Sequence, residues 1–130
     1  ALAESLNLSN IEFLGFLSKE ELEMQYKRAK AVVLPCNWFE TFGLSIIEAF
    51  AYKKPVIASK IGAIPELIED NVNGILVEPK NVQQLASAIT KLQDNNLVRV
   101  LGENAYSAVK SKYNKKMFMD EIINLLVSKI

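Results

Sequence analysis

The chain has 130 residues, half of them hydrophobic, and its 15 lysine and arginine residues balance its 15 aspartate and glutamate residues. This length suits one domain with its own core, and the balanced charge argues against nucleic acid as the main partner, because phosphate-backbone binding needs a basic excess. One cysteine and no histidine exclude an internal disulfide and histidine-based acid–base chemistry within the chain. Without a signal-peptide pattern or an apolar run of the roughly 20 residues that span a bilayer, we expect a cytoplasmic protein.

Short β-branched runs alternate with amphipathic stretches in the first part of the chain, a pattern that predicts βαβ units on a parallel sheet. Strands are expected at residues 11–14, 31–34, 55–58 and 75–77. Ser18 and Glu21 form a capping box that opens a helix to about Ala29. A second helix is expected over residues 43–52, and Pro65 marks the first turn of a short third one.

After Pro79 the pattern becomes entirely helical. Asn81 can cap a first helix, a second runs from about Leu97 to Ser111, and a third runs from Lys115 to the end. The expected fold is therefore α/β, a three-layer Rossmann-like parallel sheet with helices on both faces, followed by C-terminal helices. Because the first six residues read as the end of a helix, we expect an incomplete domain over residues 1–130. Its core is expected at about residues 8–112 and its last helix at residues 113–130.

One stretch of the chain combines a turn glycine with two carboxylates. Ligands of an open parallel sheet bind beyond the carboxyl ends of its strands, where Glu40 and Gly43 are expected. The amide groups of Gly43, Leu44 and Ser45, with the helix dipole, favour a phosphate. Glu40 and Glu48 can accept hydrogen bonds from hydroxyl groups of the same ligand. This combination suits a sugar nucleotide.

Other residues near this stretch have structural interpretations that compete with functional ones. Trp38 and Phe39 could stack on a base or a sugar, but packing in the core is an equal alternative. Cys36 is expected to be a small apolar residue at a strand end, because no paired base would make it a nucleophile. Three lysines could form a solvent-exposed face or bind a phosphate, and we favour the solvent-exposed face: Lys53, Lys54 and Lys60.

Several linked motifs follow one another in the middle of the chain. They are Glu40-x7-Glu48 with Phe42-Gly43, then Glu48-Ala49-Phe50-Ala51, Pro55-Val56-Ile57-Ala58-Ser59, Gly62, Pro65-Glu66-Leu67 and Asn73-Gly74-Ile75-Leu76-Val77. With these motifs, about residues 8–112 resemble the C-terminal, donor-binding domain of retaining glycosyltransferases. Those are two-domain, twin-Rossmann (GT-B type) enzymes of the sucrose synthase and mannosyltransferase type, in group 1 of the glycosyl transferases.

The resemblance implies a role for each matched residue. Glu48 would accept hydrogen bonds from the ribose hydroxyls of a nucleoside diphosphate sugar, and Glu40 would be the catalytic-site residue that holds a hydroxyl of the transferred hexose. The backbone of Leu17 would contact the base. The sugar and the diphosphate would meet the backbone at Thr41, Phe42, Gly43 and Leu44. The resemblance implies no cofactor and no metal.

The chain also departs from the family pattern. Lys53 and Asn71 stand where the family has turn glycines, and Ala63 replaces the second of two glycines. Lys53 would cost on the order of 1 kcal/mol in a left-handed conformation, whereas asparagine tolerates it. None of these changes touches the carboxylates.

Parts of the family pattern have no counterpart here. These are two strands of the donor domain, an Arg and Lys pair in the same domain, and the whole acceptor domain. Either residues 11–14 then pair directly with residues 31–34, or another chain or a swapped segment fills the gap. We therefore expect a fragment that lacks transferase activity of its own, and the open strand edges allow it to dimerise. Its expected partners are the nucleotide sugar and the missing N-terminal part, and the full-length enzyme could associate with a membrane surface.

Alternative functions remain open from the sequence. A non-catalytic module that binds a nucleotide sugar or a partner chain has the same motifs. A sugar-nucleotide epimerase or a glucan phosphorylase is disfavoured, because histidines and a pyridoxal-phosphate lysine are not found. A flavodoxin-like receiver would need clustered aspartates early in the chain. The base, the hexose and the acceptor are not indicated.

Overall fold

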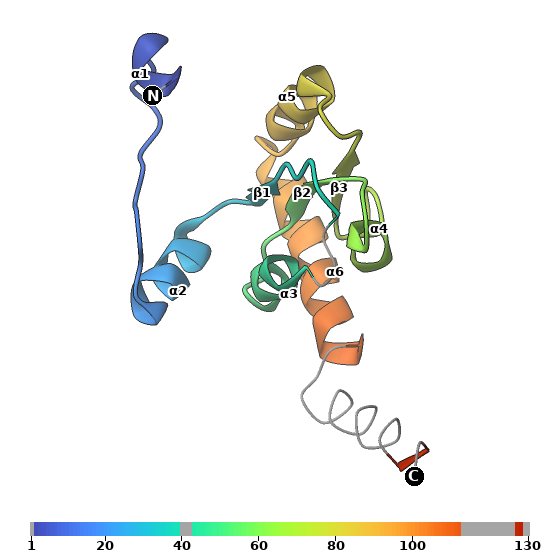
Figure 1. The fold of residues 1–130 in the computed structure, drawn as a ribbon. Coiled ribbons are helices and arrows are strands. Elements are labelled where there is room, and N and C mark those ends of the chain that lie inside the picture. Colours follow the sequence, from blue (N-terminus) through green and yellow to red (C-terminus); the bar gives the residue numbers. More distant parts are fainter. Residues whose placement is uncertain (1, 40–42, 113–126, 129–130) are drawn as a thin grey trace.

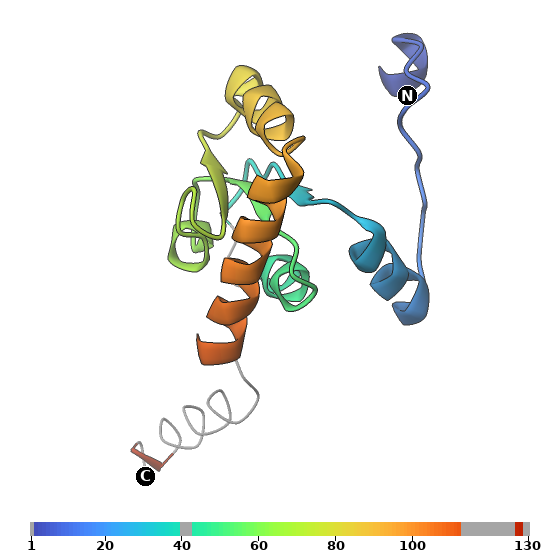
Figure 2. The ribbon, with the colours of Figure 1, turned by 180° about the vertical axis from the view of Figure 1, so that it is seen from behind.

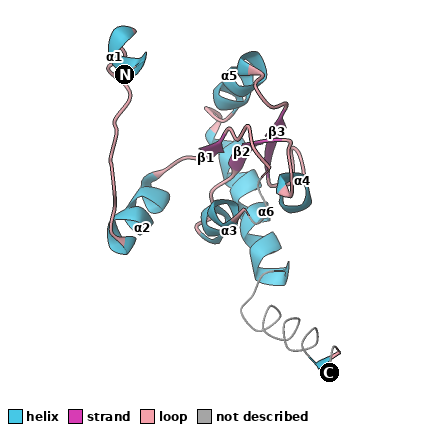
Figure 3. Ribbon diagram, in the orientation of Figure 1, coloured by secondary structure: helices cyan, strands magenta, loops and turns pink. Residues whose placement is uncertain are grey.

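The computed structural model describes residues 2–39, 43–112 and 127–128 (Figure 1). Its elements, coloured by type in Figure 3, are α1 (Leu2–Ser5), α2 (Lys19–Arg28), β1 (Val32–Leu34), α3 (Leu44–Ala51), β2 (Val56–Ser59), α4 (Ile64–Leu67), β3 (Gly74–Val77), α5 (Val82–Lys91) and α6 (Asn95–Lys112). The helix predicted from Lys115 onward lies outside the described residues. No helix of the described part has the length and apolar character that crossing a membrane requires.

Three parallel strands in the order β1-β2-β3 form the sheet of the described residues, which confirms the predicted α/β fold. Side chains alternate between its two faces, as they must along a strand. Val56 and Ala58 belong to a core that includes Phe50 of α3, whereas Ile57 belongs to a second core with Ala88 of α5. Helices therefore cover both faces, and the sheet is the middle one of three layers.

The first predicted strand, at residues 11–14, is wrong. This segment forms no strand, and Figure 1 shows it as part of an extended stretch that connects α1 to α2, away from the sheet. Its Phe13 side chain is 76% exposed. A strand needs hydrogen-bond partners on a neighbour, and within the described residues β1 pairs only with β2. Of the two alternatives for this segment, direct pairing of residues 11–14 with residues 31–34 is therefore not found.

Local capping signals predicted the helices well. In α2, Ser18 Oγ accepts the Glu21 amide at 3.2 Å and Glu21 Oε2 accepts the Ser18 amide at 2.7 Å, so the capping box is complete. In α5, Asn81 Oδ1 accepts the Gln84 amide at 2.9 Å. Pro65 lies in the first turn of α4, as predicted.

Left-handed residues flank α3 at both ends. Gly43 precedes it at φ 61°, and Lys53 follows it at φ 58°. Lys53 and Asn71 (φ 61°) thus adopt the conformation that the sequence predicted for them, whereas Ala63 is right-handed at φ −79°. The turns at Gly43 and Lys53 reverse the direction of the chain. Helix α3, which follows β1 and precedes β2 in the sequence, therefore runs back along the sheet.

Helix α6 ties the two cores together. Leu101 packs in the core on the α5 side, and Ala105 packs in the core on the α3 side. Figure 2 shows α6 running from α5 past α3. Between these two residues, Gly102 lies so close to the carbonyl oxygen of Lys53 that a Cβ atom would overlap it. The crossing of α6 over the chain just before β2 therefore requires glycine at this position.

We predict that Gly102→Ala destabilises the protein. Alanine normally strengthens a helix by about 1 kcal/mol relative to glycine. Here its methyl group would push α6 off the Lys53 backbone, at a cost of about 1–3 kcal/mol typical of overpacking.

Chemical denaturation measures the change, with the exposed Ser107→Ala in the same helix as a control that should stay within about 0.5 kcal/mol of the wild type. A Gly102→Ala protein more stable than the wild type would contradict the tight crossing.

Candidate functional site

The carboxyl ends of the three strands meet at one edge of the sheet, because all three are parallel. Loops that follow these ends surround a pocket of about 280 Å³. From β1 come Pro35 and Asn37, from β2 the buried Ser59, and from beyond β3 Glu78 and Lys80. The structure therefore has an open hollow, lined by both polar and apolar residues, at the rim where ligands of such sheets bind.

The amino end of α3 begins at the same rim. The carbonyl oxygen of Gly43 accepts the amides of Ile46 at 3.0 Å and Ile47 at 3.3 Å. The amides of Leu44 and Ser45 have no acceptor within the described residues, and both residues are exposed. Because the first amides of a helix carry partial positive charge, this end favours an anion.

Gly43 allows this geometry because it has no side chain. A Cβ atom at Gly43 would run into the side chain of Leu67 in α4. The positive φ angle of Gly43 adds strain for any other residue. The backbone conformation therefore favours glycine at the opening of α3, and any other residue would also displace the end of the Leu67 side chain.

Glu48 is exposed on α3, one turn beyond the amino end of the helix. Its Oε2 atom accepts a hydrogen bond of 3.0 Å from the hydroxyl group of Tyr26 in α2. Burial of the phenol, together with this hydrogen bond and the negative charge of Glu48, raises the pKa of Tyr26 from 10.0 to about 12, while the Ser45 side chain acts in the opposite direction. The carboxylate of Glu48 is therefore linked to α2 and still open to solvent.

The structure brings together only some of the residues that the sequence predicted. Gly43, Leu44 and Glu48 lie on one helix. Leu17 is partly buried and immediately precedes Ser18, the cap of α2. Glu40, Thr41 and Phe42 lie outside the described residues, so their predicted roles stay predictions.

The structure also decides between the alternatives left open for Trp38, Phe39 and Cys36. Trp38 is 64% and Phe39 is 79% exposed, so core packing was the wrong alternative for these two aromatics. Cys36 is buried in the core on the α3 side, as its apolar interpretation predicted. Two exposed aromatic rings at the rim are available to contact a ligand or another protein surface.

Sequence reasoning missed Tyr26. It lies 22 residues from Glu48 in the chain, so no local spacing connects the two. The one available signal was that a tyrosine on the packed side of a helix needs a hydrogen-bond partner when its hydroxyl is buried.

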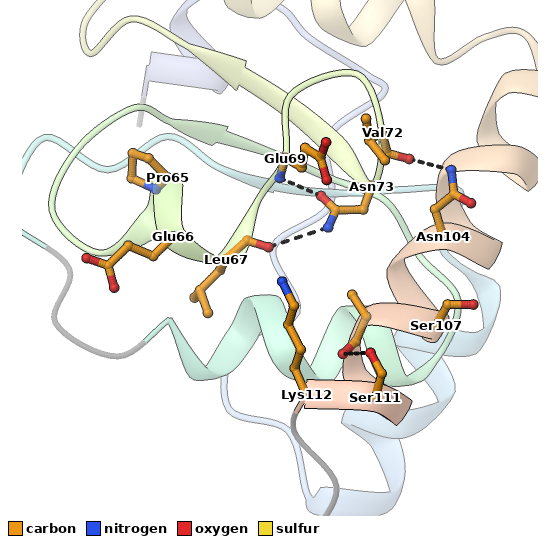
Figure 4. Close-up of a pocket in the computed structure, with 11 residues that line it drawn as sticks. Pro65, Glu66, Leu67, Glu69, Val72, Asn73, Asn104, Ser107, Ser111 and Lys112 are labelled. Atoms are coloured by element: carbon orange, nitrogen blue, oxygen red, sulfur yellow. Dashed lines mark hydrogen bonds between the residues drawn. The ribbon is translucent and has the colours of Figure 1, made fainter.

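A second pocket, of about 390 Å³, lies between α4 and the last turns of α6 (Figure 4). Its wall includes Asn73, whose Oδ1 atom accepts the Glu69 amide at 2.9 Å, and Asn104, whose side chain donates to the Val72 carbonyl oxygen at 2.8 Å. Because these amides hold the turn before β3, their polar atoms already serve the fold.

In the described part of the chain, no group of three or more histidine, cysteine, aspartate or glutamate side chains comes close enough together to hold a metal ion.

Comparison with known proteins gives a consistent result. The sequence model of the family "glycosyl transferases group 1" matches residues 1–108. An uncharacterized glycosyltransferase of Methanocaldococcus jannaschii is 35% identical over 116 residues, which cover 88% of this chain and 30% of that protein. The chain spans about a third of the length of the curated relatives it matches.

Solved structures are similar over nearly the whole chain. Sucrose-phosphate synthase of Thermosynechococcus elongatus has a TM-score of 0.86 and 32% identity, covering 99% of this chain and 33% of that one. HepE of Anabaena, solved in complex with UDP-glucose, has a TM-score of 0.87 and 30% identity, covering 97% of this chain and 35% of that one. The fold described above therefore recurs as a part of larger proteins.

We predict that the raised pKa of Tyr26 makes stability fall at high pH. The folded pKa of about 12 exceeds the ordinary value of 10.0, so the folded state favours the protonated phenol. The associated stability is complete below pH 10.0 and is lost as the pH rises toward about 12.

Thermal unfolding of the wild type and Tyr26→Phe between these pH values isolates this contribution. Tyr52, whose pKa is also raised, chiefly by burial and then by Glu23, remains in both proteins. Equal pH dependence of the two proteins would contradict the raised pKa of Tyr26.

Proposed function

The chain belongs to the family of glycosyl transferases group 1, and we propose that it is the part of such an enzyme that binds the nucleotide-sugar donor. The observation that carries this proposal is the amino end of α3, where amides for a phosphate and the carboxylate of Glu48 lie on one short helix. Similarity to HepE, whose structure contains UDP-glucose, supports a nucleoside diphosphate sugar as the ligand.

In the proposed complex, the diphosphate lies at the amides of Leu44 and Ser45, and Glu48 accepts hydrogen bonds from the ribose hydroxyls. These two sites are close enough for one ligand, because each residue of a helix advances only about 1.5 Å along the axis. The backbone at Thr41, Phe42 and Gly43 faces the sugar and the diphosphate. Leu17, in the turn before α2, contacts the base through its backbone.

The proposed reaction transfers a hexose with retention at the anomeric carbon. Its transition state resembles an oxocarbenium ion leaving a diphosphate, so the protein acts mainly by stabilising the departing negative charge. A preorganised amide donor of this kind contributes roughly 3 kcal/mol to a transition state. Glu40 holds a hydroxyl of the hexose, and neither a cofactor nor a metal is required.

Donor binding, without turnover, is the activity we propose for this chain by itself, acting in the cytoplasm. The chain matches about a third of its relatives' length, so the acceptor site is assigned to residues that these matches do not include. Transfer of a hexose by this chain alone to any acceptor would contradict this part of the proposal.

We predict that Glu48→Gln weakens nucleotide binding. Hydrogen bonds to a charged group contribute about 1.5–3 kcal/mol, so the affinity should fall about 10- to 100-fold. Calorimetric titration with UDP, GDP and ADP measures it and identifies the base.

Glu20→Gln, which removes the charge of an exposed carboxylate in the first turn of α2, is the matched control and should bind like the wild type. Absence of binding to all three nucleotides, or equal affinity of the two variants, would contradict the proposed donor site.

A separate prediction concerns Glu40. If Glu40 holds a hexose hydroxyl, Glu40→Ala should bind the bare nucleoside diphosphate as the wild type does, yet gain less affinity from an attached hexose. Titrating each protein with the nucleotide and with its hexose conjugate gives this difference directly. An unchanged gain would remove Glu40 from the proposed hexose site.

A further inference from the structure

The contact between Tyr26 and Glu48 is a side-chain hydrogen bond between α2 and α3. The hydroxyl of Tyr26 donates to Glu48 Oε2 at 3.0 Å. Within the described residues, this is the one hydrogen bond that the Glu48 carboxylate accepts. A glutamate on an exposed helix surface samples several rotamers, so a single fixed donor largely determines where its two oxygens point.

Tyr26 is itself held in place. Its ring stacks on the ring of Tyr52, with centroids 5.5 Å apart and planes 7° from parallel. It also packs at the border of the core that contains Phe50 and Ala49. The helix that carries Tyr26 is fixed at its start by the capping box of Ser18. The donor therefore belongs to a supported part of the fold, whereas Glu48 is exposed.

We infer that Tyr26 is a positioning residue, which orients the carboxylate of Glu48 for the ribose hydroxyls of the donor nucleotide. This inference rests on the proposed function and adds a residue to that site. A carboxylate offers about four acceptor positions, so the Tyr26 hydroxyl uses one and leaves the others for two neighbouring hydroxyl groups. Holding the side chain before the ligand arrives removes an ordering cost from binding.

A purely structural role for Tyr26 predicts something different. Phenylalanine at position 26 would keep the ring, its stack on Tyr52 and its packing against the core, and would remove only the hydroxyl group. If the role of Tyr26 is purely structural, Tyr26→Phe would lower the affinity for every ligand by the same factor or leave it unchanged. Under the positioning role, it selectively weakens the contact with the ribose.

The experiment compares UDP with 2′-deoxy-UDP by calorimetric titration of the wild type, Tyr26→Phe and Tyr52→Phe. The wild type should prefer UDP. In Tyr26→Phe this preference should shrink by about 3- to 10-fold, the effect expected when one side chain is no longer ordered in advance. Tyr52→Phe keeps both rings and the donor to Glu48, so its preference should match that of the wild type.

The outcomes separate the two proposals. If the wild type binds UDP and 2′-deoxy-UDP with equal affinity, or does not bind UDP, the contact between Glu48 and the ribose is overturned, and this inference with it. A wild type that prefers UDP, together with a Tyr26→Phe protein that prefers it equally, overturns the positioning role alone.

A second measurement uses the wild-type protein alone and so does not depend on whether a variant folds. With ¹³C-labelled tyrosine, the pKa of Tyr26 can be followed by NMR in the free and the UDP-saturated wild type. The pKa should stay raised in both, because the burial of the phenol and its hydrogen bond to Glu48, which raise it, both persist when the ligand binds. A return toward 10.0 on saturation would mean that Tyr26 releases Glu48, which also overturns the inference.

Discussion

The reversal of the chain at both ends of α3 is the constraint on which the rest of this structure depends. Gly43 and Lys53 are both left-handed, at φ 61° and 58°, and between them α3 lies against the sheet. This places Phe50, one of the largest fully buried side chains, in the core on the α3 side. It also places the amino end of α3 at the carboxyl rim of the sheet. The carbonyl of Lys53 in turn accommodates α6 only because position 102 is glycine.

This constraint has a direct chemical consequence. A helix whose first amides face solvent attracts anions, and a carboxylate one turn further along accepts hydroxyl groups. One helix, α3, thus carries a site that attracts anions and, about one turn away, a site that accepts hydrogen bonds from hydroxyl groups. Tyr26 adds a connection from α2, so that a side chain at the surface takes its orientation from a helix that is itself capped and packed. A nucleoside diphosphate sugar carries both kinds of group at a similar separation, which is why we propose it as the ligand.

Local signals predicted most elements from the sequence. The capping box at Ser18, the cap at Asn81 and the apolar runs of β1, β2 and β3 depend on neighbouring residues only, and each was confirmed. Residues 11–14 have an equally good strand pattern but form no strand, because a strand also depends on a partner that no local pattern reports. The same limit applies to the site. Glu48 and Gly43 were selected as candidates from linked local motifs, but Tyr26 was missed because it meets Glu48 only through the packing of two helices.

The central claim is that a nucleotide binds at the amino end of α3. Two-dimensional ¹H–¹⁵N NMR spectra of the labelled chain, recorded as UDP is added, test this claim residue by residue. The account predicts the largest shifts at the amides of Leu44 and Ser45, with smaller ones around Glu48 and Tyr26. Shifts confined to the pocket between α4 and α6, or no shifts at saturating UDP, would contradict it.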